Sequence, residues 1–165
     1  MNEIGIIYGS DTGNTEDVVS RIATLLGKEH CDLIDVSNAK VDAVSSYNKL
    51  ILASSTFGDG ELQSEWNDFI DNLDEIDFSA KTVALVGLGD AEGYAETFCN
   101  ALSLLHDKVK DATLVGQTST EGYEYEDSTA VVNGTFLGLA IDEMNQDDLT
   151  QERLEKWVEQ IKGDL

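Results

Sequence analysis

Short apolar runs alternate with helical stripes along this chain of 165 residues. The apolar runs predict five buried strands, at residues 3–8, 32–36, 49–54, 82–86 and 113–116. Apolar residues at helical spacing predict helices at about 14–27, 41–46, 63–73, 98–109 and 150–161. We expect Thr150 to cap the last helix. This alternation favours an α/β fold, a doubly wound five-stranded parallel sheet with right-handed crossovers and helices on both faces.

One segment departs from the alternation. Between Gly116 and Thr150 the chain shows no clear helical stripe, and apolar residues return near 136–140. We therefore predict that the fifth strand is split, beginning at 113–116 and resuming near 136–140, with a small β insertion at about 117–135 between the two parts. We expect the carboxylates and tyrosines of the insertion to be exposed. No repeat or linker indicates a second domain, so residues 1–165 are expected to form one domain.

The turn between the first strand and the first helix is rich in hydroxyl and amide groups. Open α/β proteins bind phosphate at such a turn, where backbone N–H groups and the helix dipole meet the anion. The candidate residues are Ser10, Asp11, Thr12, Gly13, Asn14 and Thr15. No Lys or Arg occurs before Arg21, and the Gly-Lys-Ser/Thr ending of a nucleotide-cleaving loop is absent. These donors suit a phosphate monoester that stays bound; the alternative is an ordinary turn with a threonine cap.

Two further loops follow the third and fourth strands, and each combines glycines with one aromatic residue. The first spans 55–62 and contains Phe57, and the second spans 87–94 and contains Tyr94. Because the carboxyl ends of parallel strands lie at one edge of the sheet, both loops are expected to face the phosphate turn. Two aromatic rings could hold a flat heterocycle between them. Glycines would let backbone groups reach its edge.

The charge of the chain limits its partners. Ten Lys and Arg residues against 33 Asp and Glu residues give a net charge of −23. Such a surface repels nucleic acid and anionic membranes and attracts basic protein faces, although solubility alone could account for many of the carboxylates. Two cysteines, Cys31 and Cys99, have no metal-like spacing and suggest a reducing cytoplasm. We expect no signal peptide and no membrane span.

Taken together, the three loops resemble those of the flavodoxin family. Gly-Ser-Asp-Thr-Gly-Asn-Thr at 9–15 is similar to the family's phosphate loop, and the segments 56–63 and 87–94 are similar to its two flavin-ring loops. Residues 120–143 resemble the insertion of the long-chain members. The resemblance covers essentially the whole chain and implies the sheet order 2-1-3-4-5.

The resemblance implies that the chain binds FMN. Ser10 to Thr15 would hold the phosphate, and Asp90 would accept a hydrogen bond from N3–H of the ring. Tyr94 would stack on the ring, and Phe57 stands where long-chain members commonly have Trp. The residues implied along the ring are Thr56, Phe57, Gly58, Asp59, Gly60, Leu88, Gly89, Asp90, Tyr94 and Cys99. Cys99 occupies a position where some relatives carry a polar amide.

The implied function is a low-potential one-electron carrier between redox proteins, with no substrate or catalytic residue of its own. A peptide carbonyl at Gly58-Asp59 would turn toward N5 of the flavin on reduction. We expect a cytoplasmic monomer whose partners present basic faces. Two alternatives remain at this point. A phospho-receiver domain would need clustered acids after the first strand, whereas the turn holds only Asp11. An FMN-dependent quinone reductase would need a substrate pocket over the ring.

Overall fold

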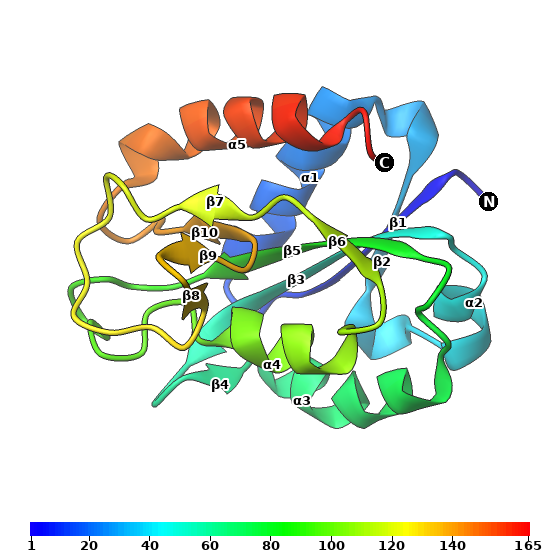
Figure 1. Ribbon diagram of the computed structural model, residues 1–165, viewed down its shortest axis with the longest axis horizontal. Helices are drawn as coiled ribbons and strands as arrows, with labels where there is room; N and C mark the ends of the chain where they lie inside the picture. The colour runs from blue at the N-terminus through cyan, green and yellow to red at the C-terminus, as the bar shows by residue number, and fades with distance from the viewer.

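The computed structural model describes all residues 1–165 and contains a central parallel sheet (Figure 1). The order of its strands is β10-β5-β3-β1-β2, with β6 also paired to β5. The strands are β1 (Ile4–Gly9), β2 (Cys31–Asp35), β3 (Lys49–Phe57), β5 (Thr82–Leu88), β6 (Thr113–Val115) and β10 (Leu139–Ile141). A short strand, β4 (Glu61–Leu62), pairs antiparallel with the end of β3. The predicted α/β fold and sheet order are confirmed.

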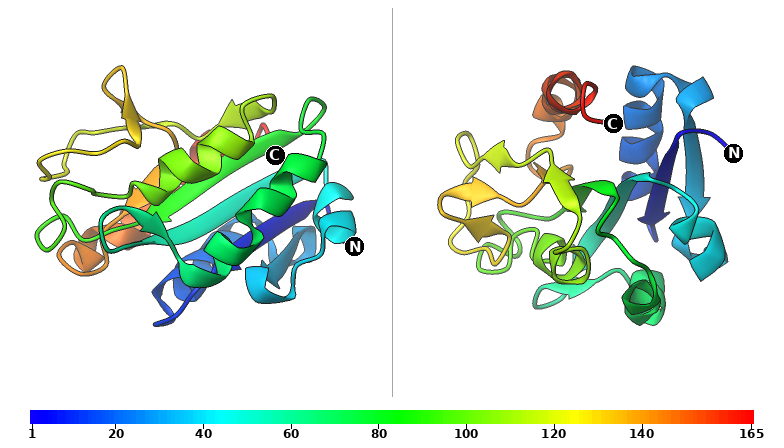
Figure 2. Two further views of the ribbon diagram at one scale, coloured as in Figure 1. Left: turned by 90° about the horizontal axis from the view of Figure 1, so that it is seen from below. Right: turned by 45° about the vertical axis from the view of Figure 1, so that its right-hand side comes forward.

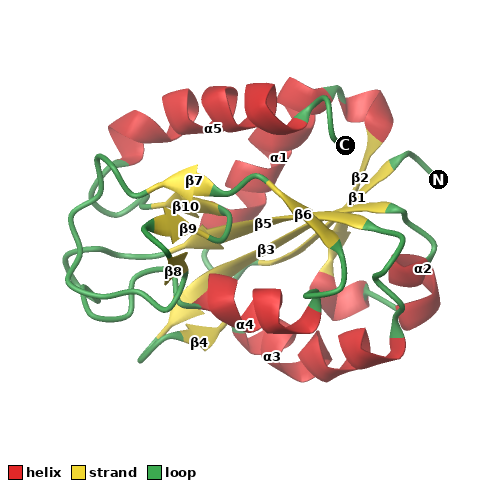
Figure 3. Cartoon of the chain, in the orientation of Figure 1, coloured by secondary structure: helices red, strands yellow, loops and turns green.

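Helices cover both faces of the sheet, as Figures 2 and 3 show. On one face lie α1 (Asn14–Leu26) and α5 (Asp147–Ile161), and on the other lie α3 (Ser64–Phe69) and α4 (Ala101–Lys108). A short helix, α2 (Val41–Ser45), precedes β3. Three 3₁₀ turns complete the helical elements, at Lys28–His30, Val36–Asn38 and Ile70–Glu75.

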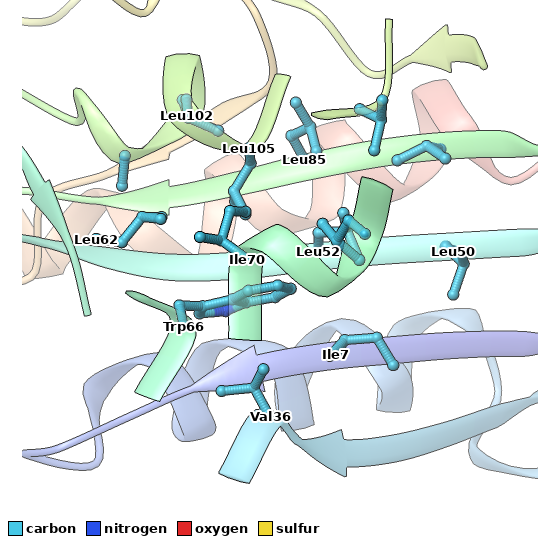
Figure 4. Packing of buried hydrophobic residues seen from close by; sticks show 14 of the residues in the cluster. Ile7, Val36, Leu50, Leu52, Leu62, Trp66, Ile70, Leu85, Leu102 and Leu105 are labelled. Carbon is cyan, nitrogen blue, oxygen red and sulfur yellow. The ribbon is translucent and has the colours of Figure 1, made fainter. Parts of the chain in front are cut away.

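The two faces bury separate hydrophobic clusters because neighbouring strand residues point to opposite sides. Ile7 belongs to the cluster beneath α3 and α4, where Trp66 is fully buried (Figure 4). Ile6 belongs to the cluster beneath α1 and α5, which includes Trp157. Strands buried on both faces read as continuous apolar runs, which is why the sequence shows no strict alternation within them. No helix combines the length and apolar composition needed to cross a bilayer.

The fifth strand is split, as predicted. β6 pairs with the start of β5, at Thr82, and β10 pairs with its end, at Val86. Between them lies a small antiparallel sheet of β7 (Thr118–Ser119), β9 (Thr135–Phe136) and β8 (Val131–Val132), in that order. At Gly138 the backbone passes so close to β5 that an added Cβ would lie 2.1 Å from the carbonyl oxygen of Leu85.

Four sequence predictions about elements were wrong in detail. The helix predicted at 98–109 spans only Ala101–Lys108. Thr150 does not cap α5, which begins at Asp147, because Leu149 N–H already bonds to the carbonyl of Gln146. The helix predicted at 63–73 is an α-helix only to Phe69 and then tightens to 3₁₀. The tyrosines of the insertion are half-buried rather than exposed, because Tyr123 and Tyr125 pack against Phe98 and Phe136.

Candidate functional site

A pocket of about 310 Å³ lies at the carboxyl ends of the strands. The turn after β1, the ends of β3 and β5 with the loops that follow them, and the loop after β10 each form part of it. It brings together eleven of the sixteen predicted site residues, namely Asp11, Thr12, Asn14, Thr15, Thr56, Phe57, Gly58, Leu88, Gly89, Asp90 and Tyr94. The remaining lining residues are Ser55, Glu143 and Met144.

The turn between β1 and α1 is built to leave N–H groups free. Ser10 Oγ accepts hydrogen bonds from the N–H of Gly13 at 3.1 Å and of Glu16 at 3.3 Å, which closes the turn. Gly13 adopts φ 94°, a left-handed conformation that favours glycine. The backbone N–H groups of residues 11, 12, 14 and 15 have no acceptor within the protein. Together with the amino end of α1, they form a cradle for an anion.

Gln63 stabilises this turn through a hydrogen bond to Asp11. It was not among the site residues predicted from the sequence. Its Nε2 donates to Asp11 Oδ1 at 3.0 Å, while its Oε1 accepts from the N–H of Trp66 at 3.0 Å and so caps α3. A Cβ at Gly9 would lie 2.1 Å from that Oε1, so the turn needs glycine there. Gln is not one of the residues that favour helix N-caps, and nothing in the sequence indicated its contact with Asp11.

Two aromatic side chains line the pocket. Phe57 is 37% exposed and Tyr94 is 50% exposed, so each presents a large ring surface. Met144, at 67% exposed, adds a third apolar group. Gly58, the residue after Phe57, also lines the pocket and adopts φ 48° with open space where a Cβ would be. The arrangement suits a flat ring that contacts protein on its faces and remains accessible at one edge.

Five predicted residues do not line the pocket. Ser10 and Gly13 shape the phosphate turn from within. Asp59 is exposed within the turn after β3, and Gly60 lies against the side chain of Asn100. Cys99 is fully buried at φ 53°, with its Sγ donating to the carbonyl of Gly87 at 3.5 Å. Burial raises the pKa of the Cys99 thiol well above its usual range.

The carboxylate of Asp90 is already engaged within the protein. Its Oδ1 accepts hydrogen bonds from the N–H of Gly93 at 2.8 Å and from Nδ2 of Asn145 at 2.8 Å. These bonds, in that order, lower the pKa of Asp90. The side chain therefore organises the turn that carries Tyr94, and its role as an acceptor for a ligand remains a prediction.

Glu143 also lines the pocket, although no pattern in the sequence indicated it. Burial raises the pKa of its carboxyl, and Arg21 Nη1 on α1 lies 3.7 Å from its Oε1. This oxygen is buried and has no hydrogen-bond partner. Met144 follows it at the surface. Both come from the loop between β10 and α5, which follows the carboxyl end of β10 and so lies at the same edge of the sheet as the other loops.

The insertion holds the far end of the Tyr94 loop. The N–H groups of Glu126 and Asp127 both donate to the carbonyl of Ala95, at 2.8 and 2.9 Å. Phe98 N–H donates in return to the carbonyl of Asp127 at 3.3 Å. The ring of Tyr125 stacks on Phe98, with centroids 5.5 Å apart. The loop that carries Tyr94, and so forms one wall of the pocket, is therefore bonded to and packed against the insertion.

Comparison with known proteins agrees with this geometry. The flavodoxin family model matches residues 6–157. A flavodoxin of Helicobacter pylori is 47% identical over 163 residues, covering 99% of this chain and 98% of that protein. Flavodoxin 1 of Escherichia coli is 46% identical, covering 98% and 93%. The crystal structure of Fusobacterium nucleatum flavodoxin bound to flavin mononucleotide superposes with a TM-score of 0.94 at 38% identity, covering 100% of this chain and 99% of that one. The chain belongs to the flavodoxin family.

Proposed function

We propose that the pocket binds FMN and that the protein carries electrons, one at a time, between redox partner proteins. The observation that carries this proposal is the cradle of free N–H groups at residues 11, 12, 14 and 15, next to a pocket lined by two aromatic rings. The solved relative with FMN bound supports it. When bound, FMN supplies the redox chemistry, and the protein supplies orientation and electrostatics.

The residues present fit the two ends of FMN. The free N–H groups, the hydroxyls of Thr12 and Thr15 and the amino end of α1 would hold the phosphate without a cation. Phe57 and Tyr94 would contact the flavin ring. Hydrogen bonds from neutral donors to a phosphate dianion are charge-assisted, which makes them stronger than ordinary ones.

The charges of the pocket favour a low reduction potential. Asp11 and Asp90 line it, and no Lys or Arg does. Negative charge nearby opposes the addition of an electron. Gly58, with φ 48° and open space around it, gives the turn after β3 the backbone freedom that the Gly58-Asp59 peptide would need to reorient.

We further propose that the partners present basic faces and that the protein works as a cytoplasmic monomer away from membranes. The net charge of −23 supports attraction to basic surfaces and repulsion from anionic lipid. Cys31 and Cys99 are both buried free thiols, as suits a reducing compartment. No observation favours the quinone reductase, and membership of the flavodoxin family argues against the phospho-receiver.

A double variant, Thr12→Val with Thr15→Val, tests the phosphate site. Valine retains the branched shape, which matters because Thr15 is only 2% exposed. Each lost bond to the dianion should weaken FMN binding by roughly 1.5–3 kcal/mol. Riboflavin, which lacks the phosphate, should bind almost as before. Quenching of flavin fluorescence measures both affinities.

Thr24→Val is the matched control, because Thr24 lies at the other end of α1 and donates to the carbonyl of Ser20. It should bind both flavins like the wild type. Equal losses of FMN and riboflavin in the double variant would show that the turn does not hold the phosphate. Absence of FMN binding by the wild type would overturn the proposed function itself.

A further inference from the structure

The loop between β10 and α5 contains a buried carboxylate without a counter-ion. Asp142 is fully buried and forms no ion pair. Its oxygens accept from the N–H of Ala91 at 3.1 Å, of Met144 at 3.1 Å and of Asn145 at 3.0 Å. Burying a charge in this way is tolerated only when hydrogen-bond donors surround it. Asp142 therefore ties the loop after β10 to the loop after β5.

The side chain of Asn145 makes a second connection between the same two loops. Its Nδ2 donates to Asp90 Oδ1 at 2.8 Å and to Asp142 Oδ2 at 2.9 Å. An amide nitrogen carries two hydrogens, and both are used here to bridge two carboxylates. Without the amide, two negative groups would face each other with no donor between them.

This bridge acts on an exposed turn that is also anchored on either side, at Ala91 by Asp142 and at Ala95 by the insertion. Residues 92–94 are exposed, including Tyr94 at 50%. Hydrogen bonds to Asp90 hold the turn together, from Gly93 N–H to its carboxylate at 2.8 Å and from Tyr94 N–H to its carbonyl at 2.9 Å. Asn145 is thus bonded to the carboxylate of Asp90, and Asp90 is bonded to the turn that carries Tyr94.

We propose that Asn145 is a positioning residue for the flavin-ring side of the pocket, acting through Asp90 on the turn that carries Tyr94. The inference rests on the proposed function only for its effect on flavin binding. The turn faces the ring and not the phosphate cradle. Loss of the bridge should therefore weaken the binding of FMN and of riboflavin by the same factor, in contrast to the threonine variants.

Asn145→Ala and Gln146→Ala form a matched pair. Gln146 is the next residue and also donates a side-chain amide, but its acceptor is the carbonyl of Gly122 in the insertion, at 3.1 Å. We expect Asn145→Ala to weaken the binding of both flavins by about 10-fold, because the loosened turn must then be ordered when the ring binds. Gln146→Ala should bind both like the wild type. Asn145→Asp should be weaker still, because it replaces the donor with a third carboxylate.

Amide hydrogen exchange of the flavin-free protein tests the bridge independently of flavin binding. The amides of Gly93 and Tyr94 should exchange at least several-fold faster in Asn145→Ala than in Gln146→Ala, while the amides of β3 remain unchanged. If the wild type bound no flavin, this result alone would still support or overturn the bridge. Should Asn145→Ala fail to fold by circular dichroism, Asn145→Ser, which keeps one hydroxyl donor, takes its place under the same criteria.

The inference fails if exchange at Gly93 and Tyr94 is the same in both variants. It also fails if both variants lose flavin equally, since that would indicate a general effect of changing this loop. A loss of FMN without loss of riboflavin in Asn145→Ala would place its action at the phosphate instead.

Discussion

At the scale of single residues, Tyr47 and Asp32 form a bond far from the pocket, at the amino ends of the strands. Tyr47 is buried and donates its hydroxyl to Asp32 Oδ2 at 2.6 Å. Burial and this carboxylate raise the pKa of Tyr47 to about 12, so the hydroxyl keeps its proton. The same bond is the largest cause of the lowered pKa of Asp32.

Tyr47→Phe should lower the free energy of unfolding by about 1–2 kcal/mol at pH 7, because a hydrogen bond to a charged group is lost. Since the folded-state pKa of Asp32 is lowered, its stabilisation is present above the unfolded pKa of about 4 and is lost as pH falls through the folded value. The difference between wild type and variant should therefore shrink at pH 3. Urea unfolding at pH 7 and pH 3 measures this difference in the free energy of unfolding. An equal difference at the two pH values would show that the Asp32 carboxylate does not account for it.

Gly58→Val tests the backbone freedom of the turn after β3. A branched residue is disfavoured at φ 48°, and the surrounding space is open, so the effect arises from the backbone alone. Oxidised FMN should still bind, and the gap between the two one-electron midpoint potentials should narrow. Gly134→Val, at φ 77° with equally open space, is the control and should leave the gap unchanged. Equal gaps in wild type and Gly58→Val would mean that this turn does not respond to reduction.

How far the site could be predicted from sequence depends on the range of the contacts. Strand ends converge in any parallel sheet, so residues next to strands, such as Thr12 and Tyr94, could be selected from local pattern. Gln63 and Asn145 could not, because their partners lie 52 and 55 residues away. Met144 lies in the loop after β10, at the same edge of the sheet, but no local pattern distinguished it as a pocket residue. Neighbouring residues determine the geometry of a turn, so a turn can be predicted from the local sequence. The side chains that hold the turn in place come from distant parts of the chain, so they cannot.

At the scale of elements, the insertion packs against the Tyr94 loop instead of extending into solvent. Its boundaries followed from the sequence because the apolar runs on either side are distinct. The burial of its tyrosines could not be predicted in the same way. Their partner Phe98 was assigned to a helix, and that helix in fact begins at Ala101. The start of α5 was also misplaced, although Asp147 and Asp148 in its first turn suit the positive end of the helix dipole.

Tyr125→Ala should loosen both the insertion and the pocket wall. It removes the ring stacked on Phe98, which should cost about 1–2 kcal/mol in the free energy of unfolding. FMN affinity should fall several-fold, because the backbone of residues 95–98 is bonded to the same insertion. Val132→Ala, at a half-exposed position on β8, is the control. Unchanged FMN affinity in Tyr125→Ala would show that the wall holds its shape without the insertion.

At the scale of the whole molecule, the charge is both large and widely distributed. The magnitude of 23 exceeds the 2–8 or so that keeps a small domain soluble. Asp59 and Glu92 are exposed in the loops around the pocket, and Glu61 is exposed on β4. A negative rim of this kind would steer basic proteins toward the flavin edge.

The rate of electron transfer to a basic cytochrome should therefore fall steeply between low salt and about 0.5 M, where charges are screened beyond a few Å. Replacing Asp59, Glu61 and Glu92 by amides should flatten this dependence and leave the FMN spectrum unchanged. The control replaces Glu29, Asp42 and Asp111, which are exposed at the opposite end of the strands, with the same change in net charge. If both triple variants behave alike, total charge matters and the rim does not.

The split fifth strand also limits how another chain could pair with the margins of the sheet, that is, with its edge strands. A continuous strand at that margin would offer an unbroken row of N–H and C=O groups to another chain. Here the margin consists of two three-residue pieces, with Gly138 pressed against the Leu85 carbonyl between them. The opposite margin, β2, carries Asp32 and Asp35. Short or charged margins are poor templates for strand addition, so crowded molecules of this protein should resist aggregation through their sheets.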